Sequence, residues 1–115
     1  MAESNGANEL PNLQWRPRAN LDRKSIAIYL GVECGNPKTA LKAIKSIDEV
    51  IERILQFPQI GKRFRHERLA SEYRMAQASP YIIFYRIVDS SIIIYRILHQ
   101  RQNIDAYEFV DLKAE

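Results

Sequence analysis

Apolar residues between positions 37 and 56 recur every three or four residues, which is the spacing of one face of an α-helix. They are Leu41, Ile44, Ile47, Ile51, Ile54 and Leu55. The positions between them are largely charged, so this segment predicts an amphipathic helix with one buried side. Pro37 suits the first turn of that helix, and Phe57-Pro58 predicts its end because the residue before a proline avoids helical geometry.

A shorter helical pattern precedes it. Asn20 or Asp22 is the predicted N-cap, and the apolar positions are Ile26, Tyr29 and Leu30, joined by Leu21. Glycines at 31 and 35 bracket the end of this helix, and Asn36-Pro37 begins the next. The two segments together predict a helical hairpin.

The period changes after Gly61, where the chain becomes rich in β-branched and aromatic residues. Residues 73–77 alternate weakly, and residues 81–88 and 92–99 are apolar runs separated by Asp89-Ser90-Ser91, which predicts a β-hairpin. A short apolar segment at 10–15 predicts an N-terminal strand. The order β-α-α-β-β-β predicts an α+β fold, with an antiparallel sheet and both helices on one face.

The register of the β-hairpin is open, because the pattern fits two loop lengths. A three-residue loop pairs Val88 with Ile92, whereas a two-residue loop pairs Asp89 with Ile92. The first places Arg86 and Arg96 on one sheet face with Phe84 and Ile94. The second moves Arg86 to a face shared with Tyr95, Ile97 and His99. In either register we expect the face away from the helices to carry arginines among apolar side chains, which suits an amphipathic peptide or an anion.

The length of 115 residues fits a single domain. We expect a flexible polar N-terminus at 1–9, a folded domain at 10–104, and an acidic tail or short helix at 105–115. The only cysteine, Cys34, excludes an internal disulfide and fits a reducing compartment. The polar start differs from a secretory leader, and the apolar runs are far shorter than the roughly 20 residues that span a bilayer. We therefore expect a cytoplasmic protein that does not interact with membranes.

The net charge of +3 is unevenly distributed. Residues 61–101 hold eight Lys or Arg side chains and three acidic ones, whereas residues 102–115 hold four acidic side chains and one lysine. A basic middle beside an acidic end indicates an anionic partner, either a nucleic acid or an acidic protein.

Motifs for common chemistry are absent from the sequence. Two histidines and one cysteine offer no zinc-like spacing, and there is no phosphate-binding loop, dinucleotide motif or nucleophile elbow. We expect no metal and no cofactor. The remaining candidates for chemistry are His99 and Arg101 at the end of a predicted strand, with Arg74 and Arg96 on its neighbours. A histidine that moves a proton and arginines that stabilise a phosphate would suit RNA cleavage. The same residues also describe a strand-end histidine with arginines on a rim, and the lack of a positioned base favours that interpretation.

Across residues 13–104 the sequence resembles the ParE branch of the ParE/RelE toxin superfamily. The resemblance begins at Trp15, Pro17 and Ala19 and passes through Asp22, Ile26 and Tyr29 into the second helix, at Ala40, Ile44, Ile47, Ile51 and Leu55. It continues through Pro58 and Gly61 as a "P-x-x-G" link, Arg74, the "Y-x-x-x-Y" of Tyr81 to Tyr85, and Ile94 to Leu98 before His99-Gln100-Arg101. The chain departs from the pattern at Arg23, where the family usually has leucine, and at Gln102-Asn103, where many members carry more charge.

The resemblance implies the toxin of a type II toxin–antitoxin module, held inactive in a hetero-oligomer with a cognate antitoxin that folds as it binds. ParE-type members act on DNA gyrase by binding, with no sequence-specific nucleic-acid contact expected. We expect the target to contact Arg74, Arg96, His99 and Arg101. We expect the antitoxin to contact Tyr81, Ile83, Tyr85, Ile92 and Ile94.

Two alternatives remain at this stage. A RelE-type ribosome-dependent mRNA endonuclease would rely on Arg74, His99 and Arg101, with Glu67 or Glu72 as a base. A non-toxic peptide-binding domain would share the fold without either target. The long helical hairpin and the "P-x-x-G" link favour the ParE interpretation, in which the protein is a binding toxin rather than an enzyme.

Overall fold

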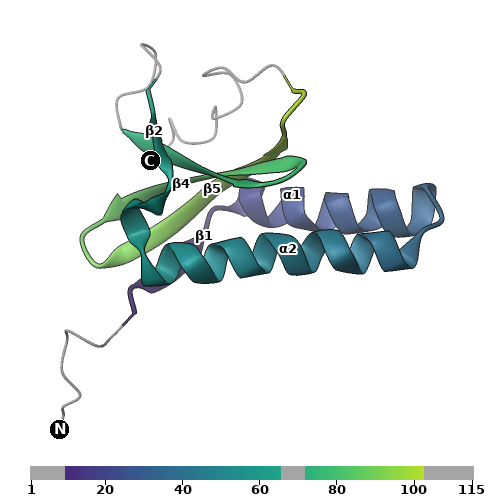
Figure 1. Cartoon of the computed structure of the whole chain (residues 1–115), viewed down its shortest axis with the longest axis horizontal. Coiled ribbons are helices and arrows are strands. Elements are labelled where there is room, and N and C mark those ends of the chain that lie inside the picture. Colours follow the sequence, from purple (N-terminus) through teal and green to yellow (C-terminus); the bar gives the residue numbers. More distant parts are fainter. Residues whose placement is uncertain (1–9, 66–71, 103–115) are drawn as a thin grey trace, which may run out of the picture.

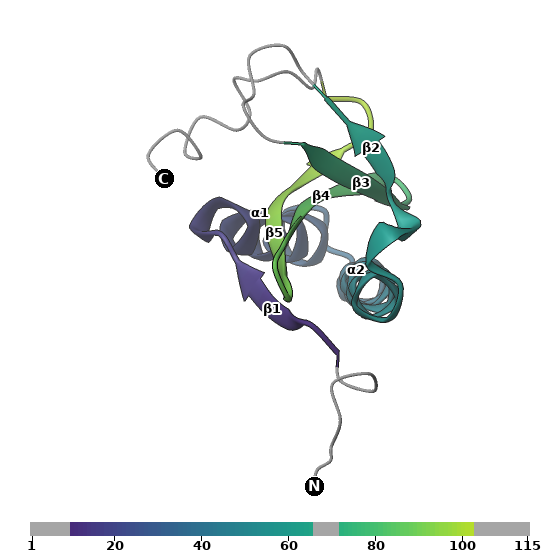
Figure 2. The same ribbon diagram turned by 90° about the vertical axis from the view of Figure 1, so that its left-hand side faces the viewer.

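The computed structural model describes residues 10–65 and 72–102, which form a five-stranded sheet with two helices against one face (Figures 1 and 2). In chain order the elements are β1 (Asn12–Trp15), α1 (Pro17–Ile28), α2 (Pro37–Gln56), β2 (Lys62–Phe64), β3 (Tyr73–Ala78), β4 (Tyr81–Val88) and β5 (Ser91–His99). The predicted α+β fold and helical hairpin are confirmed. The interpretations placed on 1–9 and 105–115 lie outside the described residues.

The sheet has the order β1-β5-β4-β3-β2. Strands β3, β4 and β5 pair antiparallel, as expected, but β1 pairs parallel with β5. The sheet is therefore mixed rather than wholly antiparallel. Strand β2, which lines the free edge of β3, was not predicted because three residues are too few to show an alternation.

The second helix matches its prediction at both ends. The Asn36 side chain accepts a hydrogen bond from the Thr39 backbone N–H at 3.1 Å and caps α2, with Pro37 in its first turn. Its buried side, which includes Ile47, Ile51 and Ile54, packs on the sheet.

The first helix differs from its prediction, because it begins at Pro17, about one turn before the expected caps Asn20 and Asp22. Asp22 is engaged elsewhere, in an ion pair described below. The helix passes into a π-helical turn at Tyr29–Glu33, and Gly35 follows with a positive φ of 66°.

Between the turn and Tyr85 the β4–β5 register is neither of the two predicted ones, whereas from Phe84 to Tyr81 it is the register predicted for a three-residue loop. The turn consists of Asp89 and Ser90, so Val88 pairs with Ser91. Farther along, Tyr85 pairs with Ile94 but Phe84 pairs with Arg96. One residue is thus inserted into β5 at a β-bulge, which changes the direction of the side chains after it.

Two hydrophobic clusters result, one on each face of the sheet. The larger lies under the helices and contains the buried sides of β4 and β5 together with α2. The smaller lies on the opposite face, where Tyr73, Phe84, Tyr95 and Leu98 are buried. Arg86 lies over the rings of Tyr73 and Tyr95, at 5.8 and 6.0 Å from the ring centroids. This face was expected to be an open binding surface. That expectation is wrong for the four buried residues, Tyr73, Phe84, Tyr95 and Leu98.

The link between α2 and β2 is tied to the sheet by one buried side chain. The Tyr85 hydroxyl donates to the Pro58 carbonyl at 2.6 Å and accepts from the Gly61 N–H at 2.9 Å. Burial raises the pKa of Tyr85, because the phenolate would lose its hydration. A Cβ on Gly61 would lie 2.6 Å from the Tyr85 hydroxyl and 2.9 Å from the Met75 carbonyl oxygen, so no side chain fits there. The "P-x-x-G" spacing therefore places the Pro58 carbonyl and the Gly61 N–H at the same tyrosine hydroxyl.

This contact generates a stability prediction. Tyr85→Phe removes a hydroxyl but leaves the buried Gly61 N–H without its acceptor, so we expect the free energy of unfolding to fall by about 1–3 kcal/mol. Tyr29→Phe, at a tyrosine that is 54% exposed, should change it by less than about 0.5 kcal/mol. Urea denaturation of the two variants measures both values. Equal losses would show that the hydroxyl contributes nothing specific to the link.

Candidate partner-binding surfaces

The four residues expected to contact the target do not form one surface. Arg74 on β3 donates to the carbonyl oxygens of Gln59 at 3.2 Å and Gly61 at 2.8 Å, so it holds the α2–β2 link. In the sheet register Arg74 pairs with Tyr85, whereas His99 pairs with Tyr81. Four residues along β4 and two strand spacings across it separate their backbones by about 16 Å.

Arg96 is not on the surface. Only 5% of it is exposed, and its guanidinium forms a bidentate ion pair with Asp22 of α1, with N–O distances of 2.8 and 2.9 Å. The same carboxylate accepts a hydrogen bond from the Ile97 N–H at 2.8 Å. The expectation that Arg96 contacts a target is wrong, because the bulge in β5 leaves it engaged with α1 rather than exposed on a sheet face.

His99 and Arg101 are brought together at the end of β5. The His99 Nδ1 accepts a hydrogen bond from the Arg101 backbone N–H at 3.1 Å, and the His99 N–H donates to the Gln102 side chain at 2.8 Å. In a neutral imidazole this assigns the proton to Nε2. The ring meets that of Tyr81 edge to face at 5.5 Å.

The two candidate bases are not beside this histidine. Glu72 forms ion pairs with Arg63 at 3.0 Å and with Arg65 at 3.8 Å, and it directly precedes β3, which lies on the opposite side of β4 from β5. Glu67 lies outside the described residues. Among the described residues that a ribonuclease would use, only His99 and Arg101 therefore lie close together.

The five residues expected to contact an antitoxin are core residues. Tyr81 is 8% exposed, and Ile83, Tyr85, Ile92 and Ile94 are fully buried in the cluster beneath the helices. A partner could reach them only if the helices moved away from the sheet. The apolar character of these residues is evident in the sequence, but the face of the sheet that the helices cover is not.

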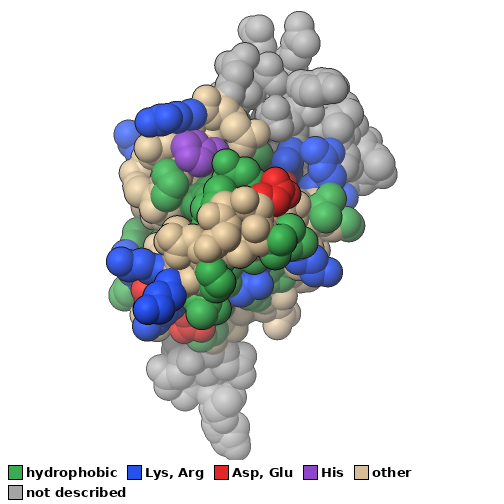
Figure 3. All heavy atoms as spheres, turned by 90° about the vertical axis from the view of Figure 1, so that its right-hand side faces the viewer, with side chains coloured by type: hydrophobic (Ala, Val, Ile, Leu, Met, Phe, Trp, Pro, Cys, Tyr) green, Lys and Arg blue, Asp and Glu red, His purple; other side chains and the backbone are tan. Residues whose placement is uncertain are grey.

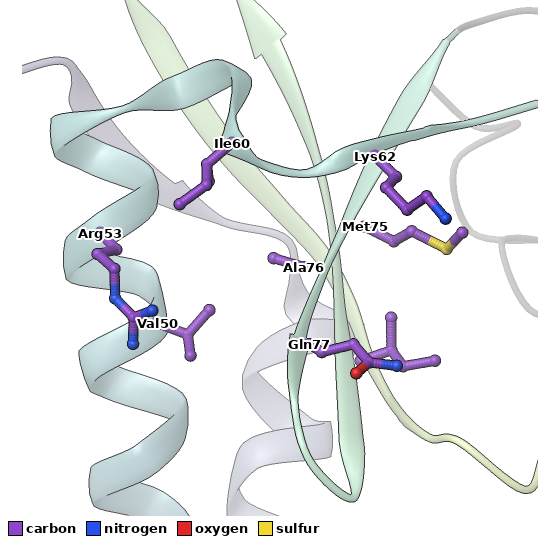
Figure 4. A pocket seen from close by; sticks show the side chains of 8 residues that line it. Val50, Arg53, Ile60, Lys62, Met75, Ala76 and Gln77 are labelled. Atoms are coloured by element: carbon purple, nitrogen blue, oxygen red, sulfur yellow. The ribbon is translucent and has the colours of Figure 1, made fainter.

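A groove of about 480 Å³ lies between the C-terminal half of α2 and the strands β2 and β3 (Figure 4). Its lining is mainly apolar, with Val50, Ile60, Met75, Ala76 and Ile82. Two cations, Arg53 from α2 and Lys62 from β2, belong to the same lining, together with Gln77. This groove was not predicted; the apolar Ile60 just after the end of the helix is the one signal for it in the sequence.

A smaller hollow of about 260 Å³ lies between α1 and the end of β5. Asp22, Ser25, Ile26 and Tyr29 line it from α1, and Tyr81, Ile97, His99 and Gln102 line it from the opposite side. Burial raises the pKa of Tyr81, and a hydrogen bond with Cys34 raises that of Tyr29, so both phenols stay protonated near neutral pH.

Within the described residues, no helix is both long and apolar enough to cross a membrane, and no three His, Cys, Asp or Glu side chains are grouped so as to hold a metal ion.

The comparisons with known proteins agree on one family. Residues 13–104 match the model described as the ParE toxin of the type II toxin–antitoxin system parDE. Among solved structures, the chain is similar to one titled "Chromosomal ParDE TA system from P. aeruginosa", with 26% identity and a TM-score of 0.63 over 78% of this chain and 96% of that chain. The search of curated proteins found no match.

The buried Arg96–Asp22 pair generates a prediction with an internal control. Asp22→Ala leaves an almost fully buried guanidinium without its carboxylate, which we expect to cost about 3–5 kcal/mol in the free energy of unfolding. Asp48→Ala breaks the Arg23–Asp48 pair, whose side chains are 34% and 47% exposed, and should cost no more than about 1 kcal/mol. Chemical denaturation at one salt concentration compares them. Similar losses would contradict the structural role of Arg96.

Proposed function

We propose, from the premise that the chain belongs to the ParE family of toxins of type II toxin–antitoxin systems, that it inhibits growth by binding DNA gyrase. In this proposal a cognate antitoxin neutralises the toxin in a hetero-oligomer. The toxin acts in the cytoplasm, by contact with protein rather than by reading a nucleic-acid sequence.

The observation that carries this proposal is the dispersal of the groups that RNA cleavage would need. A general acid or base must come within hydrogen-bond reach of the proton that it moves, and a charge-stabilising arginine must reach the same phosphate. Arg74 is directed at the α2–β2 link about 16 Å from His99, and Arg96 is buried against Asp22. A toxin that only binds does not need these groups to converge.

His99 and Arg101 then belong to a binding surface rather than an active site. Both are accessible at the end of β5, beside the small hollow. As rim residues they contribute contact energy in graded amounts.

The large groove between α2 and β3 is the best-formed candidate for the antitoxin-binding site. Its apolar lining suits the hydrophobic side of a segment that folds on binding. Arg53 and Lys62 supply positive charge for an acidic antitoxin. A segment seated there would also lie against the exposed edge strand β2.

The first test of this function follows the early effects of the toxin in cells. On antitoxin depletion we expect DNA synthesis to fail before protein synthesis. We also expect His99→Ala to remain at least partly toxic, because it removes one contact and no chemical step. A catalytic His99 would instead lose about 10²–10⁴ in rate on substitution. Early loss of translation with cut messages, abolished in His99→Ala, would replace the gyrase proposal with the ribonuclease.

The second test asks whether the antitoxin binds in the groove. Arg53→Glu combined with Lys62→Glu places two negative charges in the groove, so we expect the dissociation constant for the antitoxin to rise at least tenfold at low salt. Lys42→Glu combined with Lys45→Glu makes the same change of net charge farther along α2 and should leave that constant nearly unchanged. Calorimetric titration measures the dissociation constant of both variants. An equal effect in the two would show that the groove is not the antitoxin-binding site.

A further inference from the structure

The helical hairpin exposes apolar side chains where a solvated helix usually carries polar ones. Leu21, Ile28 and Val32 are 57%, 54% and 75% exposed, and Leu41 on α2 is 73% exposed. Residues 21, 28 and 32 are separated by two turns and one turn, so they follow one side of the first helix over about 16 Å. We call these four residues the outer strip.

The pairing of the two helices brings Leu41 level with the part of the first helix that carries Ile28 and Val32. Arg23 forms its ion pair with Asp48, and a Cβ on Gly31 would lie 3.4 Å from that of Ala40. These two contacts define an antiparallel register in which Leu41 lies level with Leu30, between Ile28 and Val32. The outer strip is thus continuous across the hairpin. Figure 3, which looks at the hairpin tip, shows hydrophobic side chains gathered there among Lys and Arg side chains.

The charged side chains toward the hairpin-tip end of the outer strip are predominantly basic. Two acidic side chains of the hairpin, Asp22 and Asp48, are neutralised by Arg96 and Arg23. Five basic side chains in residues 17–46 have no ion-pair partner among the described residues, against one acidic side chain, Glu33. They are Arg18, Lys24, Lys38, Lys42 and Lys45. Two exposed acidic side chains, Glu49 and Glu52, lie farther along α2, level with the Leu21 end of the strip, so the excess of basic side chains lies toward the hairpin tip.

The small hollow adjoins the outer strip through Tyr29, which is half exposed and follows Ile28 on the same helix. Its volume of about 260 Å³ lies below the roughly 300–1,000 Å³ of sites for small molecules. It therefore suits a single anchoring side chain of a protein that lies along α1.

We propose that the outer strip is the surface by which this toxin grips its target, and that the target presents an acidic amphipathic helix to it. The helix places its apolar side on Leu21, Ile28, Val32 and Leu41, its carboxylates near the five basic side chains, and one large side chain in the hollow beside His99. This inference rests on the proposed function in one respect, that the toxin acts by binding a protein.

The test uses two matched double variants of the full chain. Leu21→Ser with Ile28→Ser alters the outer strip, and Leu10→Ser with Phe57→Ser alters two equally exposed apolar residues elsewhere. We expect the strip variant to lose toxicity at least tenfold, as surviving colonies after antitoxin depletion, while the control stays toxic. Antitoxin affinity and melting temperature of the complex should match wild type for the strip variant, which excludes misfolding.

A binding measurement accompanies the growth assay. A labelled peptide with leucines at helical spacing and glutamates between them should bind wild type at least tenfold more tightly than the strip variant, and more tightly than the same peptide with lysines. Equal toxicity of the two variants overturns the proposal, whatever the target is. So does a loss of antitoxin affinity in the strip variant, or strip-dependent binding to phosphatidylglycerol vesicles without binding to the peptide.

The two proposals can fail separately. If the strip variant loses toxicity but wild type does not bind purified gyrase, gyrase is the wrong target and the outer strip stands. If gyrase binds wild type and the strip variant equally, gyrase stands and the outer strip is overturned.

Discussion

The ion pair between Arg96 and Asp22 determines how the first helix meets the sheet. A buried pair of this kind is tolerated only when its geometry is good and its remaining polar atoms are satisfied. Here the contact is bidentate, and the carboxylate also accepts the Ile97 N–H. Because α1 is held at this point, Ser25 and Tyr29 lie across from Tyr81 and His99, and the small hollow forms between them. The pair also removes the negative charge of Asp22, so the exposed side of the hairpin is left with its basic residues.

The two surfaces of this toxin lie in different parts of α2. Arg53 lines the groove, whereas Leu41 belongs to the outer strip, and twelve residues of helix separate them by about 18 Å. An antitoxin that occupies the groove alone would leave the strip accessible. Neutralisation then requires a toxin–antitoxin complex bulky enough to keep the target away from the strip. Because the helical hairpin is long, an antitoxin bound in the groove can inhibit the toxin without covering the outer strip itself.

The residues that were candidates for chemistry have structural roles in this fold. Arg74 closes the α2–β2 link, Arg96 fixes α1, and His99 accepts a hydrogen bond from the chain that follows it. Tyr85, expected at an interface, holds the link through its hydroxyl and forces a glycine at position 61. In a small domain a polar side chain can satisfy several backbone groups at once, and such a residue resembles a functional one in the sequence.

The sequence by itself determined the class of fold and the existence of both α-helices and of every strand except the short β2. The spacing of apolar residues in α2, its start at Asn36-Pro37 and the β-branched runs of β4 and β5 are local signals, and each was read correctly. Only the tertiary structure decided which faces are covered, because a one-residue change of register exchanges the two faces of a strand. Because of the bulge beside Tyr85, Arg96 pairs with α1. The packing of α2 over the sheet buries Ile83 and Ile94. The groove and the outer strip are formed by segments far apart in the chain, so no local pattern could specify them.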